Sequence, residues 1–362
     1  MTMEWAILLS KVIVVLLGLL TVVPIMLFVE RRGSALMQNR LGPNRIGPFG
    51  FLQTVADIGK FLFKEDRSWG HVDRFYFTIA PWIVVIPALM TFAAIPFAST
   101  IDWRGFHIQF QAANLDVGIL YCFSIASLGV YGIIIGGWAS NNKYSLLGGL
   151  RSSSQMISYE LSMGLSIIGI LMVFSSVKLG DIARAQGETL IQLGVFHIPK
   201  WGIFIQPLGF LLFLTSVFAE TNRLPFDLPE GESEIVAGYH LEYGSMRFAL
   251  FMMAEYINMA VASALVSTLF FGGWQMLPGF HALHAALFSS SPFEVQEWAR
   301  VVMEAVSLLL KISFFMWLFV WVRWTLPRFR FDQLMSFGWK VMFPLAMANV
   351  LLTSFLIYKG FI

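Results

Sequence analysis

The sequence predicts an all-α membrane protein that crosses the bilayer about eight times and forms a single membrane domain over residues 1–362. Hydrophobic residues make up 57% of the chain and charged residues only 13%, with a mean hydropathy of +0.72. A soluble domain carries about twice that charged fraction. Roughly 20 consecutive apolar residues cross a bilayer, and runs of about that length recur along the whole chain.

Eight apolar runs predict the transmembrane helices. They cover residues 5–29, 77–98, 117–139, 157–177, 202–219, 247–272, 300–323 and 339–358. The fourth run opens on the polar segment SSSQMISYELSMG, and the fifth is short. The N-terminus has no basic segment and no small-residue cleavage site, so we expect a span there rather than a signal peptide.

The loop charges predict the orientation of the chain. Most of the lysines and arginines outside the spans fall on one side, above all in loop 30–76 and in the segment that precedes the last span. Cytoplasmic loops carry the excess of Lys and Arg, so this side is expected to face the cytoplasm or a mitochondrial matrix. An even number of spans then places both termini on the outer side.

The first cytoplasmic loop, residues 30–76, predicts structure at the membrane surface. Its first half is rich in Gly, Pro and Arg, and its second half, FLQTVADIGKFLFKED, repeats apolar residues at spacings of three and four. That spacing is typical of an amphipathic helix lying on the bilayer. The loop's arginines could line a polar pocket or anchor the chain to lipid headgroups, and the pattern alone leaves both open.

Acidic residues are concentrated between positions 220 and 255, where seven of the 22 in the chain occur. Glu255 lies eight residues into the sixth span, about 12 Å along its axis. Glu160 lies near the start of the fourth span, and Glu220 ends the fifth. Carboxylates at such depths usually serve proton or ion movement, and neighbouring ones titrate together. The alternative is that each is a packed residue that hydrogen-bonds between helices.

Two further polar residues invite an expectation. Lys311 lies near the middle of the seventh span, where a lysine needs a carboxylate or water partner. His240 lies in the acidic loop and is expected to be solvated. The lone cysteine, Cys122, lies in an apolar run, which excludes disulfides and makes a cysteine metal site unexpected. The chain has no CxxC, HExxH, GxGxxG or P-loop motif, so no bound metal or nucleotide cofactor is expected. No nucleic-acid partner is expected either.

Six segments carry a distinctive combination of motifs. They are Glu30-Arg31-Arg32, RLGPNRIGPFGFLQTVADIGKFLFKED (40–66), SYELSMG (158–164), AETNRLPFDLPEGESEIVAGYHLEY (219–243), FMMAEYINM (251–259) and VRWTLPRFRFDQLMSFGWK (322–340). Together they resemble the H-type membrane subunits of bacterial NADH:quinone oxidoreductase, the respiratory complex I, whose mitochondrial counterpart is NADH dehydrogenase subunit 1. The resemblance spans nearly the whole chain.

The resemblance implies an enzyme subunit at the junction of the membrane arm and the peripheral arm. Quinone would be the substrate, in a chamber whose other wall lies on peripheral-arm subunits that carry the terminal iron–sulfur cluster. FMN and the iron–sulfur clusters would belong to partner subunits, so this chain would bind no cofactor and contribute no catalytic residue. The remaining partners would be the small and antiporter-like membrane-arm subunits. The membrane would be a bacterial inner membrane, which the chain length favours, or a mitochondrial inner membrane.

The resemblance also assigns roles to residues, motif by motif. The wall and entry of the quinone chamber would be formed by Arg31, Arg40, Arg45 and Asp57. The loop that rearranges with quinone binding would contribute Phe226, Asp227, Glu230, Glu232 and Glu234. A charge relay toward the antiporter-like subunits would begin with Glu160, Glu220 and Glu255. Quinone reduction would thereby drive proton translocation.

Three alternatives remain. A related membrane subunit of an energy-converting hydrogenase would share the relay but not the quinone. A stand-alone cation/proton transporter would work without partners, although no internal repeat of helix groups is visible and such repeats are typical of transporters. A passive membrane anchor would leave Glu255 and Lys311 without an explanation.

Overall fold

The computed structural model describes residues 2–66, 70–103, 105–193, 196–228, 238–289 and 292–360. Its long helices are α1 (Thr2–Met37), α3 (Arg74–Phe92), α4 (Gly118–Ala139), α5 (Lys143–Phe174), α8 (Pro207–Glu220), α9 (Ser245–Phe270), α11 (Phe293–Thr325) and α13 (Phe343–Tyr358). The short helices are η1 (Pro48–Gly50), α2 (Gln53–Phe63), α6 (Leu179–Ala185), α7 (Gly202–Ile205), α10 (Phe280–Phe288), α12 (Phe331–Phe337) and the π-helical turn η2 (Gly338–Met342). Two antiparallel hairpins pair β1 (Ala98–Trp103) with β2 (Phe106–Phe110), and β3 (Thr189–Leu193) with β4 (Phe196–Pro199).

This architecture confirms the predicted all-α polytopic membrane fold. Within the described residues, seven helices are long and apolar enough to cross a membrane, and α12, η2 and α13 together form the last of them. The fifth predicted span is a shorter apolar helix, α8, of 14 residues. It is separated from α7 by Gln206, whose backbone angles (φ −129°, ψ 60°) are not helical.

Several helices begin or end up to a few turns away from the predicted span boundaries. The first helix continues to Met37, so Glu30, Arg31 and Arg32 belong to α1 and not to the loop. The fourth helix begins at Lys143 rather than at 157, and α3 ends at Phe92 rather than at 98. Apolar length measures only the part of a helix within lipid, whereas backbone hydrogen bonding continues beyond the hydrocarbon region.

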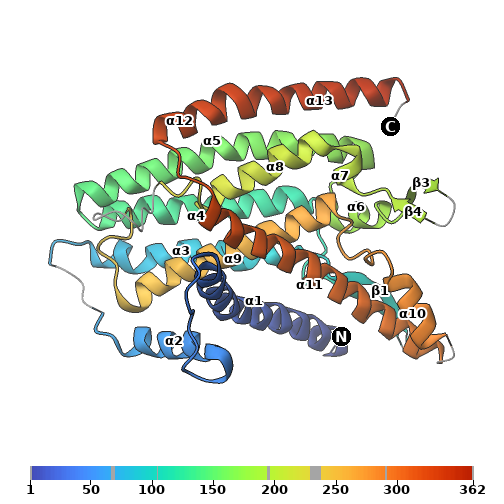
Figure 1. Ribbon diagram of the computed structural model, residues 1–362, viewed down its shortest axis with the longest axis horizontal. Coiled ribbons are helices and arrows are strands. Elements are labelled where there is room, and N and C mark those ends of the chain that lie inside the picture. Colours follow the sequence, from blue (N-terminus) through green and yellow to red (C-terminus); the bar gives the residue numbers. More distant parts are fainter. Residues whose placement is uncertain are drawn as a thin grey trace.

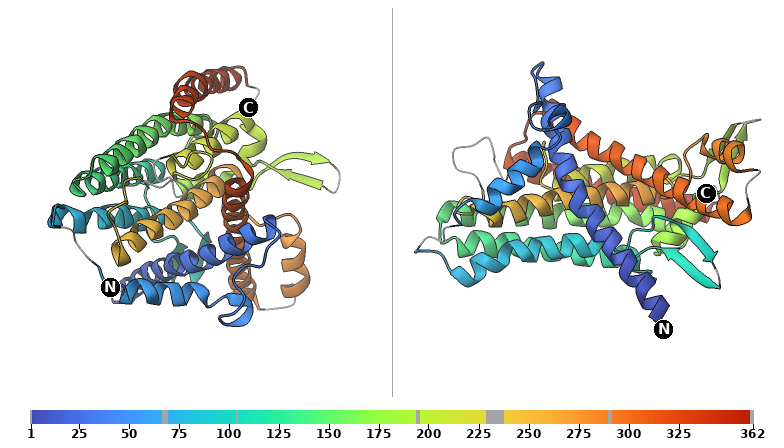
Figure 2. Two further views of the ribbon diagram at one scale, coloured as in Figure 1. Left: turned by 60° about the vertical axis from the view of Figure 1, so that its left-hand side comes forward. Right: turned by 90° about the horizontal axis from the view of Figure 1, so that it is seen from below.

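The two ends of the bundle differ in character. The hairpins, α6 and α10 lie at one end, and both chain termini lie at that same end (Figure 1). The amphipathic helix α2 lies at the opposite end, and α1 is inclined to the neighbouring helices (Figure 2). Helix α2 was expected as a surface helix, and most of its large apolar side chains, among them Val55 and Leu62, are exposed.

Helix α9 forms the centre of the bundle. Every residue from Met259 to Phe270 is buried, and α9 packs against α1, α3, α8 and α11. Its buried hydroxyls at Ser263, Ser267 and Thr268 each donate to the carbonyl four residues earlier, which satisfies them within the helix. The central position of α9 brings its polar residues within reach of several other helices.

The last helix, α13, lies along the outside of the bundle beside α5 (Figure 1). The Gln206 side-chain amide at the break before α8 donates to the Thr353 hydroxyl at 2.7 Å. Gly169 and Gly209 leave room for this contact, since a Cβ on either would lie within 3.4 Å of Gln206 Oε1. Small residues and interhelical hydrogen bonds of this kind hold membrane helices together.

The close contact of α3 with α4 generates a stability prediction. A Cβ on Gly132 would lie 2.5 Å from Val84 and 2.9 Å from the Ala80 carbonyl oxygen, whereas a Cβ on Gly129, one turn earlier, would meet nothing within 4 Å. Gly132→Ala should therefore destabilise the protein by about 1–3 kcal/mol through overpacking. The matched Gly129→Ala should be neutral or slightly stabilising, because alanine favours helix. Thermal unfolding of the purified proteins compares the two, and equal melting temperatures would contradict this account of the packing.

Candidate functional site

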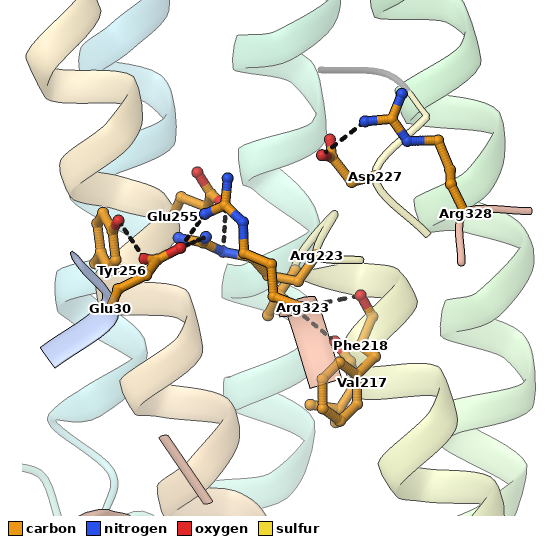
Figure 3. Close-up of polar contacts among 10 residues, drawn as sticks. Glu30, Val217, Phe218, Arg223, Asp227, Glu255, Tyr256, Arg323 and Arg328 are labelled. Atoms are coloured by element: carbon orange, nitrogen blue, oxygen red, sulfur yellow. Dashed lines mark hydrogen bonds and ion pairs between the residues drawn. The ribbon is translucent and has the colours of Figure 1, made fainter. Parts of the chain in front are cut away.

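A buried ionic cluster joins three parts of the chain. Arg223, in the turn after α8, lies between Glu30 of α1 and Glu255 of α9 (Figure 3). Its Nη1 is 3.2 Å from Glu30 Oε1, and its Nε is 2.5 Å from Glu255 Oε1. The side chain of Arg223 is only 4% exposed. A guanidinium stays protonated in proteins and offers several donors in one plane, so one arginine can bridge two carboxylates.

Two more side chains complete the cluster. The Tyr256 hydroxyl donates to Glu30 Oε2 at 2.6 Å, and the Arg223 guanidinium stacks 4.7 Å from the centre of the Tyr256 ring. Arg323, near the end of α11, forms a second ion pair with Glu30. Two guanidiniums thus face two carboxylates among the described residues. We call Glu30, Arg223, Glu255, Tyr256 and Arg323 the ionic cluster.

A buried amide of α5 helps to place Arg223. Gln155 of α5 is fully buried, and its side-chain nitrogen donates to the carbonyls of Ala219 and Phe226 at 2.8 and 2.9 Å. It also lies 3.2 Å from the Asn222 side-chain oxygen. The turn from Ala219 to Phe226 is therefore fastened to α5, which points Arg223 toward α1 and α9.

A cavity of about 60 Å³ lies beside the ionic cluster between α3, α4, α5, α8 and α9. Its wall includes two of the predicted relay carboxylates, Glu220 and Glu255, with the amides Asn222 and Asn258. A buried water molecule needs a volume of about 10–15 Å³ and two to four polar groups that can hydrogen-bond to it. The cavity meets both requirements for a few water molecules.

The third predicted relay residue, Glu160, does not line this cavity. It lies on α5, half-buried, within electrostatic range of Glu220. The three predicted relay carboxylates therefore lie in one region of the bundle. Only Glu255 among them belongs to the ionic cluster.

Two of the predicted chamber residues, Arg31 and Asp57, join α1 to α2. Arg31 forms an ion pair with Asp57 of α2, and Lys60 lies 3.6 Å from the same carboxylate. Burial raises the pKa of Asp57, but the hydrogen bonds from Arg31 and Gln53 and the two nearby cations outweigh it, so that pKa lies below its usual range. Asp57 therefore remains ionised at neutral pH.

The other two arginines are more open. Arg40 is exposed and its Nε donates to the Gln38 side chain at 2.6 Å, whereas Arg45 is exposed and makes no ion pair with the described residues. The same loop exposes large apolar side chains, including Leu41, Phe49 and Phe63, which are 86%, 78% and 92% exposed. It therefore presents both cationic and apolar groups.

The loop after α8 is packed where it is described. Phe226 is buried between Tyr159 and Phe329, each with ring centres 5.5 Å away. Asp227 is buried and lies 3.3 Å from Arg328 (Figure 3). The remaining predicted loop residues, Glu230, Glu232 and Glu234, lie outside the described residues.

The expectation for His240 was wrong, and Lys311 has protein partners of a kind that was not expected. Lys311 was expected to have a carboxylate or water partner, but it donates to the backbone carbonyls of Gly273 and Gln275 at 2.8 and 2.7 Å. His240 was expected to be solvated, but it is buried and packs against Tyr239 and Phe248. Lys311 meets the carbonyls that follow the end of α9, where cations are favoured.

Sequence reasoning missed four members of the ionic cluster, one of which, Tyr256, was not singled out at all. Glu30, Arg223 and Arg323 counted only as loop charges, although Glu30 and Arg323 both follow long apolar runs on the same predicted side of the membrane. Their common position at one membrane surface was the only feature of the sequence that could have predicted the pairing. In the described part of the chain, no group of three or more His, Cys, Asp or Glu side chains could hold a metal ion.

Comparison with known proteins identifies the family. The model of the NADH dehydrogenase family matches residues 10–354. A protein of Bdellovibrio bacteriovorus, named as the H subunit of NADH-quinone oxidoreductase, is 43% identical over 96% of this chain and 95% of its own length. Proteins of the same name from Deinococcus deserti and Thermomicrobium roseum are 48% and 47% identical, over 95% and 94% of this chain and 82% and 92% of their own lengths.

These matches confirm the predicted resemblance and the expectation of an oxidoreductase subunit. The relatives' names also make each of them one subunit of a larger assembly, as expected. The agreement extends over both the apolar helices and the segments that carry the ionic cluster. The chain belongs to the NADH dehydrogenase family.

Proposed function

We propose that this chain is the membrane subunit of a proton-translocating NADH-quinone oxidoreductase that forms part of the quinone chamber and passes the charge change of quinone reduction into the membrane. The proposal rests on one observation: consecutive residues of α1 contact the first loop and the ionic cluster. Arg31 pairs with Asp57 of α2, and Glu30 pairs with Arg223 and Arg323. Neighbouring residues of an α-helix point about 100° apart, so α1 links the first loop directly to the ionic cluster.

The first loop has the composition of a site for an amphiphilic ligand. Arg45 offers donors that are not engaged by the described carboxylates, and the exposed Leu41, Phe49 and Phe63 suit an apolar tail. Ligand sites combine a mostly apolar lining with a few placed polar groups. The chamber would be completed by peripheral-arm subunits that carry the redox centres, including FMN and iron–sulfur clusters.

The ionic cluster is suited to transmit charge. Reduction of a quinone to the quinol takes up two electrons and two protons, so it draws protons from nearby acidic groups. A proton lost or gained at Glu30 or Glu255 would change the net charge around Arg223, because the dielectric screening in this buried cluster is low. Glu220 and Glu255 line the same cavity, and Glu160 lies within electrostatic range of Glu220, so the change would pass between these three carboxylates. The antiporter-like subunits would receive it.

We further propose a bacterial inner membrane, with both termini on the outer side. The excess of Lys and Arg at the α2 end of the molecule supports this orientation. The curated relatives named above come from bacteria.

Removing one charge from the cluster tests the relay. Glu255→Gln keeps the volume and an acceptor for Arg223 but cannot ionise. We expect assembly and most NADH:quinone reductase activity to survive, while protons moved per electron pair fall about tenfold, within the range of an energetic coupling between sites. Proton uptake by reconstituted vesicles measures the ratio. Glu188→Gln, at an exposed outer pair with Lys200, is the control and should leave the ratio unchanged. A normal ratio in the Glu255 variant would remove it from the relay.

Shortening an open arginine tests the chamber. Arg45→Ala should lower kcat/KM for quinone by about tenfold to a hundredfold, as expected for a lost hydrogen bond to a charged donor. The effect should appear mainly in KM, because the redox centres are untouched. Lys143→Ala, an exposed cation at the start of α5, serves as the control. Steady-state kinetics with a water-soluble quinone make the comparison, and unchanged kinetics in an assembled enzyme would place Arg45 outside the chamber.

A further inference from the structure

A second cavity, of about 550 Å³, lies at the opposite end of the molecule from α2. Its wall is built from the hairpin β1–β2, the segment between β2 and α4, helix α6, and Trp274 after the end of α9. Small-molecule sites have volumes of about 300–1,000 Å³. This cavity therefore has the size of a ligand site, and the proposed quinone chemistry at the other end makes no use of it.

The wall of this cavity combines polar and apolar residues. Ser99 Oγ is buried and has no hydrogen bond to any described residue, while the Ser99 N–H donates to Glu304 at 2.7 Å. Asn114 and Gln109 also line the cavity. The amides of Asn114 and Gln109 can donate to or accept from a molecule in the cavity, whereas Ser99 Oγ has no accessible surface there.

Two cations of the wall have donors to spare. Lys178 Nζ lies 3.1 Å from Asp116, but Asp116 is 94% exposed, and such a pair contributes little. Arg184 Nη1 lies 3.6 Å from Asp181, which is beyond hydrogen-bonding distance. An ammonium has three donors and a guanidinium five, so both side chains can bind another anion. Asp116 and Asp181 lie beside these two cations, so the cations bring no net positive charge to the cavity but do bring free donors.

The cavity also lies where the apolar helices end. Helix α3 ends at Phe92, α4 begins at Gly118 and α5 ends at Phe174. The cavity is formed mainly by the segment between α3 and α4 and by the residues that follow α5. That level of a membrane protein is occupied by lipid headgroups, where tryptophan is also common. Pro96, Phe110 and Trp274 supply apolar surface beside the cations.

We propose that this cavity binds the phosphodiester headgroup of an anionic phospholipid from the leaflet at this end of the molecule. A phosphodiester carries one negative charge, and its two free oxygens can accept from Lys178 and Arg184. The inference goes beyond the proposed function and does not depend on it.

Photolabelling of the assembled complex tests the site. The complex is purified through a tag on this chain and incubated with phosphatidylglycerol that carries a diazirine in its headgroup. After illumination, peptide mass spectrometry should find the label concentrated on residues 96–114 and 178–184. The double variant Lys178→Gln, Arg184→Gln should lower that labelling by at least about tenfold, the loss expected for charge-assisted hydrogen bonds.

Lys200→Gln is the matched control, because Lys200 lies at the same end but not in this wall. Arg184→Gln alone, at a side chain that is 67% exposed, provides a second variant should the double variant fail to assemble. Equal labelling of the wild type and either of the two cavity variants overturns the proposal. Competition with soluble glycerol phosphate distinguishes a lipid headgroup from a free phosphate compound as the ligand. If glycerol phosphate displaces the label as well as unlabelled phosphatidylglycerol does, the site is not a lipid site.

Discussion

The pairing of Arg223 with Glu30 and Glu255 is the constraint on which the rest of this structure depends. All three side chains are at most 10% exposed, and they come from α1, the turn after α8, and α9. Taking a charge out of water costs several kcal/mol, and leaving one buried charge without its partner costs about 3–5 kcal/mol. The chain can therefore bury any one of these groups only if the other elements arrive in register, which fixes α1 against the centre of the bundle.

This constraint also explains how α1 would respond to events at the proposed quinone site. The residue after Glu30 is Arg31, which is held by Asp57 of α2. A shift of α2 or a change of charge near it acts on α1, and the next side chain along the helix belongs to the ionic cluster. The cavity beside Glu255 then lies one contact away. No long chain of residues is needed between the two regions, since one turn of helix α1 contains both ion pairs.

The sequence was informative about the membrane and less so about the pairings. Apolar length predicted the spans because lipid sets that length, but it could not predict that α1 continues to Met37, since helix continues outside lipid. Glu255 could be singled out from its depth in an apolar run. Its partner Arg223 could not, because the contact joins residues that no helical spacing relates. Lys311 shows the same limit: its position predicted a partner, but not that backbone carbonyls would supply it.

Infrared difference spectroscopy of the assembled enzyme tests the central claim most directly, because it reports protonation of individual carboxyl groups when quinone is reduced. The account predicts a carboxyl signal on quinone reduction that disappears in a Glu255→Gln variant and changes in a Glu220→Gln variant. The signal should persist in Glu188→Gln, whose carboxylate lies between α6 and β3, at the opposite end from α2. The same signal in the wild type and in all three variants would show that quinone reduction does not change the protonation of these carboxylates. The ionic cluster would then have only a structural role.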